Sequence, residues 1–156
     1  MTSIVLLAVA VIVFFWETVT LQGTFFIQDV MVQNYPFRHF FSEALKHFEF
    51  PLWHPGINCG FPLFAEGQSG ILYPFNFFSA VLLPTWVAIN YNVSFHLWLG
   101  GVGTFLYLRV IGVSPVAATT AGMTYALSGY IVVRAMSQNF VDVSGWIPFL
   151  FLFLEI

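Results

Sequence analysis

Charged side chains are scarce in this sequence: Asp, Glu, Lys and Arg make up 7% of its 156 residues, and hydrophobic residues make up 59%. Soluble domains carry about 25% charged residues, so this composition excludes a soluble globular domain and a disordered tail. Four basic residues provide no basic stripe for nucleic acid, and a net charge of −3 indicates no particular partner. The single cysteine, Cys59, excludes an internal disulfide and a cysteine-rich metal cluster. An integral membrane protein is the class that remains.

The few charges are also unevenly placed, and the uncharged stretches indicate the organisation of the chain. Of the eleven charged residues (four basic and seven acidic), seven lie between positions 17 and 66. A membrane crossing takes about 20 mostly apolar residues, which predicts an all-α integral membrane protein with about four spans in a single module. The expected spans lie near 3–21, 88–109, 115–134 and 143–156. A long outer loop, 22–87, follows the first span.

The two ends of the chain carry further expectations. No basic residue precedes the first apolar stretch, and Ala8 and Ala10 lie inside that stretch rather than after it. A signal peptide has a basic start and a small-residue cleavage site, so we expect an uncleaved helix. The last apolar stretch, 143–156, is shorter than one crossing of about 20 residues. It predicts that the sequence is the N-terminal module of a longer protein.

Two features of the expected spans concern their packing. Small residues indicate close contact between the second and third spans, at Gly100, Gly101, Gly103, Ala118, Gly122 and Ala126. His96 lies within the second span, where an ionisable group is expected to face the protein interior. We interpret His96 as a structural hydrogen-bonding residue rather than a catalytic one.

The outer loop contains an amphipathic helical pattern over 36–50. Apolar residues recur at i, i+3 and i+4 spacing, at positions 37, 40, 41, 44, 45 and 48. Pro36 suits a first helical position and Pro51 ends the pattern. The flanking spans favour a helix that lies along the membrane surface. The alternative is a helix packed on a soluble cap.

Two acids of the outer loop stand apart from this helix. Asp29 and Glu66 are each flanked by apolar residues. A carboxylate in apolar surroundings is costly unless it is paired, hydrogen-bonded or metal-bound, which makes both acids candidate functional residues. Helix capping or an ion pair with Arg38 or Lys46 would explain them equally well. The segment 52–74, which contains Glu66, is rich in Pro, Gly and aromatic residues, which predicts an ordered, irregular loop.

The order of short motifs resembles the YfhO-type family of bacterial membrane proteins. The outer loop contributes Gln28-Asp29, Tyr35-Pro36-Phe37-Arg38, Pro51-Leu52-Trp53-His54-Pro55, Gly60-Phe61-Pro62, Gln68-Ser69 and Tyr73-Pro74. The later stretches Ala126-Leu127-Ser128-Gly129-Tyr130 and Trp146-Ile147-Pro148 fit the same pattern. His54 replaces the Asn usual in the family, and Glu66 stands where an Asp is common. The resemblance covers essentially the whole chain.

This family is similar to the GT-C class of membrane glycosyltransferases, so the resemblance implies the N-terminal part of a GT-C-like fold in the bacterial cell membrane. The implied activity transfers a sugar from a polyprenyl-phosphate donor to a glycopolymer, lipid or protein acceptor of the cell envelope, on the outer face. Asp29 would be the catalytic base. Glu66 and Asp142 would hold a divalent metal, Mg²⁺ or Mn²⁺ rather than Zn²⁺. Substrate or donor binding would involve Arg38, His54, Gln68, Tyr73, Arg134 and Asn139.

Two other functions stay open: a transporter for lipids or small molecules, and a non-catalytic membrane assembly factor. We expect Glu66 to face the same outer cavity as Asp29, with Gln68 beside it. This convergence would favour the enzyme, and separation of the two acids would favour the assembly factor. A polar tunnel through the bundle would favour transport. The resemblance also predicts a topology in which the outer loop and 134–142 lie outside and Arg109 lies at the cytoplasmic face.

Overall fold

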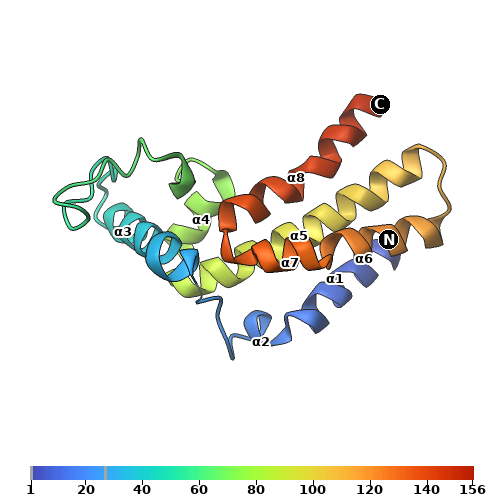
Figure 1. The fold of residues 1–156 in the computed structure, drawn as a ribbon, viewed down its shortest axis with the longest axis horizontal. Coiled ribbons are helices and arrows are strands. Elements are labelled where there is room, and N and C mark those ends of the chain that lie inside the picture. Colours follow the sequence, from blue (N-terminus) through green and yellow to red (C-terminus); the bar gives the residue numbers. More distant parts are fainter. Residues whose placement is uncertain (1, 27) are drawn as a thin grey trace.

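The computed structural model describes residues 2–26 and 28–156. All of its regular elements within these ranges are helices (Figure 1). The α-helices are α1 (Thr2–Phe14), α2 (Trp16–Val19), α3 (Tyr35–Lys46), α4 (Pro74–Leu82), α5 (Thr85–Val110), α6 (Pro115–Ala126), α7 (Gly129–Val133) and α8 (Gln138–Glu155). A π-helical turn (Val30–Asn34) leads into α3, and 3₁₀ turns precede α4 (Gly67–Ser69) and α8 (Arg134–Met136).

Helix α5 is the centre of a helical bundle, with α1, α6 and α8 packed around it (Figure 1). Glycines bring α5 close to two of its neighbours. A Cβ atom built at Gly122 of α6 would lie 2.7 Å from the carbonyl oxygen of Gly101, and one at Gly145 of α8 would lie 2.9 Å from that of His96. Larger side chains would hold these backbones apart. The close packing expected of the second and third spans is therefore confirmed.

The sequence predicted the boundaries of the long helices better than it predicted the number of membrane spans. Helix α5 covers the second expected span, and the helical segment Pro115–Met136, made of α6, α7 and the 3₁₀ turn after them, covers the third. Within the described ranges, Pro115–Met136 is the one helix that is both long and apolar enough to cross a membrane. Helix α1 has 13 residues and ends at Phe14 instead of continuing to position 21. Helix α5 has 26 residues, but polar side chains lower its hydropathy, so a count of four spans is not confirmed.

The loops gather at two opposite ends of the bundle (Figure 1). The outer loop and the turn before α8 lie at one end, where Ser137 Oγ donates a 2.8 Å hydrogen bond to Asp29 Oδ2. The turn between α5 and α6 lies at the other end, near both termini (Figure 1). The outer loop and 134–142 therefore share one end of the molecule, as the expected topology requires.

Residues 35–82 form a cap over the outer-loop end of the bundle, built from α3, α4 and the irregular loop between them. The apolar face of α3 is buried against this loop and α4 in one cluster, which contains Phe37, Phe41, Leu63, Ile71 and Ala80. Phe37, Phe40, Phe41 and Leu45 of the expected apolar stripe pack in or against this cluster, whereas Phe48 at the end of the stripe is fully exposed. Most of the stripe is thus covered by protein, and the position of α3 along the membrane surface stays a prediction.

A second apolar cluster lies within the bundle and joins α1, α5, α6, α7 and α8, through Val11, Val93, Leu97, Ala126, Ile131 and Val141. Polar side chains lie between the two clusters, where the cap meets α5 and α8. This arrangement places a buried polar layer at the end of the bundle that carries the outer loop.

Candidate functional site

The buried polar layer, here called the polar seam, is formed by Arg38, Tyr73, Asn76, Asn92, His96 and Asp142. Its central contact is an ion pair between Arg38 Nη2 of α3 and Asp142 Oδ2 of α8, at 3.5 Å. Only 8% of the Arg38 side chain and 12% of the Asp142 side chain is exposed. Burial lowers the pKa of the Arg38 guanidinium from its ordinary value, and the Asp142 carboxylate acts in the opposite direction.

A chain of hydrogen bonds extends from His96 to the surface. His96 Nδ1 lies 2.7 Å from the carbonyl oxygen of Asn92, so Nδ1 donates and Nε2 is free to accept. The Tyr73 hydroxyl lies 2.5 Å from His96 Nε2 and donates to it. Trp146 Nε1 in turn donates to the Tyr73 oxygen at 2.9 Å. Burial raises the pKa of Tyr73, so its hydroxyl keeps its proton at neutral pH.

Two asparagines connect the cap to α5. Asn92 Nδ2 donates to Asn76 Oδ1 at 2.7 Å, and Asn76 Nδ2 donates to the Gly70 carbonyl and to Asp142 Oδ2, at 3.2 and 3.4 Å. Several buried polar atoms have no hydrogen-bond partner within the described residues, among them Asn92 Oδ1, Asp142 Oδ1 and both amide atoms of Gln138. Unsatisfied buried polar groups are rare. Their concentration around α5 and the start of α8 marks this region as more than a packing contact.

The seam borders a cavity of about 260 Å³, here called the Tyr73 cavity. Its lining consists of Gly67, Gly70, Tyr73, Asn139, Asp142, Val143 and Trp146. Three of these residues, Tyr73, Asn139 and Asp142, were expected to bind substrate, donor or metal. The structure brings these three residues together.

A second, larger cavity of about 420 Å³, here called the Asp29 cavity, contains the expected catalytic acid. Its lining consists of Gln28, Asp29, Gly129, Tyr130, Val133, Arg134, Met136 and Ser137. Asp29 and Arg134 come from the two segments expected outside, and both are exposed. The Arg134 guanidinium lies 5.7 Å from the ring centres of Tyr130 and Phe140. A carboxylate and a guanidinium thus share one hollow without being buried.

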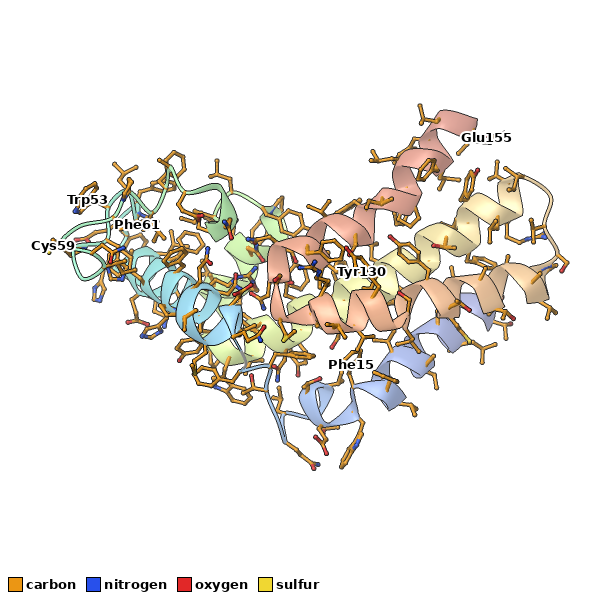
Figure 2. All side chains as sticks on the ribbon, viewed as in Figure 1. Phe15, Trp53, Cys59, Phe61, Tyr130 and Glu155 are labelled. Carbon is orange, nitrogen blue, oxygen red and sulfur yellow. The ribbon has the colours of Figure 1, made fainter. Side chains whose placement is uncertain are left out.

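The remaining expected site residues lie elsewhere. Glu66 lines a third hollow, beside the Tyr73 cavity and separate from Asp29. Gln68 is exposed and accepts a hydrogen bond from Gln33 at 3.0 Å. His54 pairs with Phe61 through backbone hydrogen bonds at the loop tip, where Figure 2 shows Phe61, Trp53 and Cys59 far from Tyr130. The expectation that Glu66 and Asp29 face one cavity is therefore wrong.

The residues expected to hold a metal do not form a ligand set. Across residues 2–26 and 28–156, no group of three His, Cys, Asp or Glu side chains comes close enough to bind an ion. Asp142, moreover, is already paired with Arg38, which reduces the negative charge that it offers to a cation. Glu66 Oε2 is buried without a partner, but no second acid accompanies it in its hollow.

Sequence reasoning missed Asn76 and Asn92 of the polar seam and Trp146 of the Tyr73 cavity. One signal was available, because α5 carries Asn90, Asn92 and His96 close together on a helix whose other residues are mostly apolar, and polar residues in a span face the interior. The interpretation of His96 as a hydrogen-bonding residue agrees with its contacts to Asn92 and Tyr73.

Comparisons with known protein families, with curated proteins and with solved structures found no match. The resemblance to the YfhO-type family therefore stays a prediction from the sequence.

Proposed function

We propose that this chain is the outer-face catalytic module of a multi-span bacterial membrane glycosyltransferase of the GT-C type. Exposed apolar side chains on two helices support the membrane setting. Helix α1 exposes Val9, Val13 and Phe14, and α8 exposes Phe153 and Leu154. Apolar surfaces of this extent are rare in soluble monomers, and lipid contact explains them. In this proposal α1, α5 and α8 cross the membrane together with Pro115–Met136.

The observation that carries the proposal is the shared cavity of Asp29 and Arg134. The two residues lie 105 positions apart in the sequence, yet they line one hollow of about 420 Å³ at the outer-loop end of the bundle. An acid can accept a proton from an acceptor hydroxyl, and an arginine can neutralise a phosphate. Both functions are needed for transfer from a lipid-linked sugar phosphate.

The chemistry follows from these two roles. The acceptor hydroxyl oxygen attacks the anomeric carbon of the donor sugar while Asp29 takes the hydroxyl proton. The bond between the sugar and the phosphate oxygen breaks, and its electron pair leaves with the polyprenyl phosphate. Arg134 compensates the charge that develops on this phosphate. Ser137, which donates to Asp29 Oδ2 at 2.8 Å, holds the carboxylate in position.

The test is Asp29→Asn in the full-length protein, because Asn keeps the shape of Asp but cannot act as a base. We expect sugar transfer to a membrane acceptor to fall by about 10²–10⁴-fold, the usual contribution of a general base. Asp29 is exposed, so expression and thermal unfolding should stay normal. Glu49→Gln, which neutralises another exposed acid of the outer loop, is the matched control. Normal transfer by Asp29→Asn would overturn the catalytic assignment.

A non-catalytic assembly factor is the second candidate, favoured by the separation of Asp29 and Glu66. The tip of the cap also exposes large apolar side chains suited to a protein contact, among them Phe48, Leu52 and Trp53. Under this function Asp29→Asn has no effect, whereas Trp53→Ala together with Phe48→Ala abolishes assembly of the cell-envelope complex. The two variants therefore separate the two functions.

A further inference from the structure

A groove between the N-terminal helices and α5 has no role in the chemistry proposed above. It has a volume of about 320 Å³ and is here called the α1–α5 groove; its apolar lining includes Ala8, Ile12, Val19, Phe75, Phe95 and Trp98. These residues belong to α1, α2, α4 and α5. The Asp29 cavity is lined instead by 28–29, α7, the 3₁₀ turn before α8 and Ser137. The two sites share no lining residue and no helix.

The α1–α5 groove offers a ligand almost no hydrogen-bonding group. Among the described residues, no charged side chain lines it. The Ser94 hydroxyl donates to the Asn90 carbonyl at 3.0 Å, and Trp98 Nε1 donates to the Ile4 carbonyl at 3.3 Å. An extended peptide has N–H and C=O groups that need partners, and burying them without partners costs free energy. The lining therefore excludes a peptide strand, an ion and a ligand rich in hydroxyl groups.

The size of the groove excludes a helix inside it. One turn of an α-helix is about 5.4 Å tall and 10–12 Å across with its side chains, so it fills about 420–610 Å³, which is more than the whole groove. Along α5 the groove extends from Tyr91 to Trp98, which at 1.5 Å per residue is about 10 Å. One bilayer leaflet has a hydrocarbon depth of about 15 Å, half of the core thickness. A single hydrocarbon chain matches the groove in size and in chemistry.

The position of the groove also favours a lipid chain. The groove lies in the half of α5 that is nearer to the outer loop. Ile12 lines it and is 47% exposed, so the groove is continuous with the exposed apolar surface of α1 at Val9 and Val13. A chain can therefore enter from the bilayer without crossing a polar surface. Tyr91 lies at the outer end, and tyrosine is favoured at the level of lipid headgroups.

We infer that the α1–α5 groove binds one acyl chain of a phospholipid from the outer leaflet, with the headgroup at the Tyr91 end. The inference rests on the membrane setting of the proposed function and not on sugar transfer. The lipid-linked sugar donor is the other lipid to consider. A donor has to reach Asp29, and the groove shares no lining residue with that cavity. A phospholipid that takes no part in transfer is therefore the occupant that the geometry favours.

The experiment is native mass spectrometry of the full-length protein in detergent micelles, titrated with palmitoyl-oleoyl phosphatidylethanolamine or phosphatidylglycerol and no sugar donor. We expect one phospholipid to stay bound to each protein. Ala8→Phe and Val19→Phe place a ring in the groove from α1 and from α2, so each should weaken this binding by at least tenfold. Val9→Phe is the matched control, because it adds the same ring to the exposed face of α1, outside the groove.

Three results would overturn the inference. The wild-type protein retains no phospholipid, as when another helix of the full-length chain closes the groove from outside; the folded groove variants retain it like Val9→Phe; or polyprenyl phosphate displaces it at an equal or lower concentration. Val19→Phe tests the groove even if Ala8→Phe fails to fold. Phospholipid binding by a protein that transfers no sugar would reject the proposed function and leave the inference standing.

Discussion

The Asp29 cavity and the polar seam each contain one carboxylate and one arginine, but the two pairs differ in their exposure to water. In the cavity, Asp29 and Arg134 are both exposed; Asp29 accepts one hydrogen bond from Ser137, and Arg134 lies over an aromatic ring. In the seam, Arg38 and Asp142 are buried against each other. Water already satisfies the first pair, so a ligand can replace that water. The second pair depends on the protein alone, so each of its charges requires the other.

Desolvation explains the difference. Moving a charge out of water costs several kcal/mol, and a partner offsets this cost only when both charges remain. The lowered pKa of Arg38 reflects this cost, and Asp142 opposes it. The comparison therefore predicts that substitutions in the seam change the stability strongly and substitutions in the Asp29 cavity change it little. Ligand binding should instead be affected strongly by substitutions of Asp29 and Arg134 and little by substitutions in the seam.

The largest effect is expected for Asp142→Ala, which leaves the Arg38 guanidinium buried without its partner. Breaking a buried pair in this way costs about 3–5 kcal/mol. We expect this loss in the free energy of unfolding, measured by denaturant titration of the full-length protein in detergent micelles. The joint variant Arg38→Leu with Asp142→Leu should recover most of it, because both charges are then gone.

An exposed ion pair provides the control for this prediction. Lys46 Nζ and Glu43 Oε1 are 2.7 Å apart, closer than the seam pair, but about half of each side chain is exposed. Pairs in water contribute little to stability, so Glu43→Gln should leave the unfolding midpoint unchanged. An equal loss of unfolding free energy in Glu43→Gln and Asp142→Ala would contradict the prediction that burial makes the seam pair important.

A smaller effect is expected for Tyr73→Phe, which removes one hydroxyl from the seam. His96 Nε2 loses its donor, and Trp146 Nε1 loses its acceptor. Trp146 is exposed enough to find water, so the loss should be about 1 kcal/mol, the typical net contribution of a hydrogen bond. The same unfolding titration measures it. Tyr35→Phe is the control, because the Tyr35 hydroxyl makes no hydrogen bond within the described chain. An equal loss of unfolding free energy in Tyr35→Phe would contradict a stabilising role for the hydrogen bonds of Tyr73.

The sequence predicted the long helices well and the cap poorly, for physical reasons. Apolar runs located α5 and the 115–136 helix within a few residues, because helical span length is a local property. The amphipathic pattern of α3 gave its apolar face correctly but not what covers that face. Loop residues such as Leu63 and Ile71 cover it. Helical periodicity describes only the residues of the helix itself, so it cannot predict contacts with residues far along the chain.

The same limit explains the candidate site. Isolated charges indicated Asp29, Arg134, Arg38 and Asp142 individually, but their pairing depends on which loop meets α8. The side chains of Arg38 and Asp142 meet across 104 positions of sequence. The family resemblance implied that Glu66 belongs to the same site as Asp29. The irregular segment before α4 places Glu66 in a different hollow, and no local rule gives that path.

Arg134→Gln is expected to have the smallest effect on stability but a clear effect on binding of the sugar donor. The guanidinium is exposed and lies 5.7 Å from the Tyr130 and Phe140 ring centres, so its removal should lower stability by only about 0.5–1 kcal/mol. A charged hydrogen bond to a phosphate contributes about 1.5–3 kcal/mol. If Arg134 contacts the donor phosphate, its loss should raise the KM for a polyprenyl-phosphate sugar by at least about tenfold. Arg109→Gln is the matched control for total charge, because Arg109 lies in the last turn of α5, which ends at the opposite end of the bundle (Figure 1). Equal donor KM values for the two variants would remove Arg134 from the site and leave the Asp29 cavity without a group to compensate the leaving phosphate.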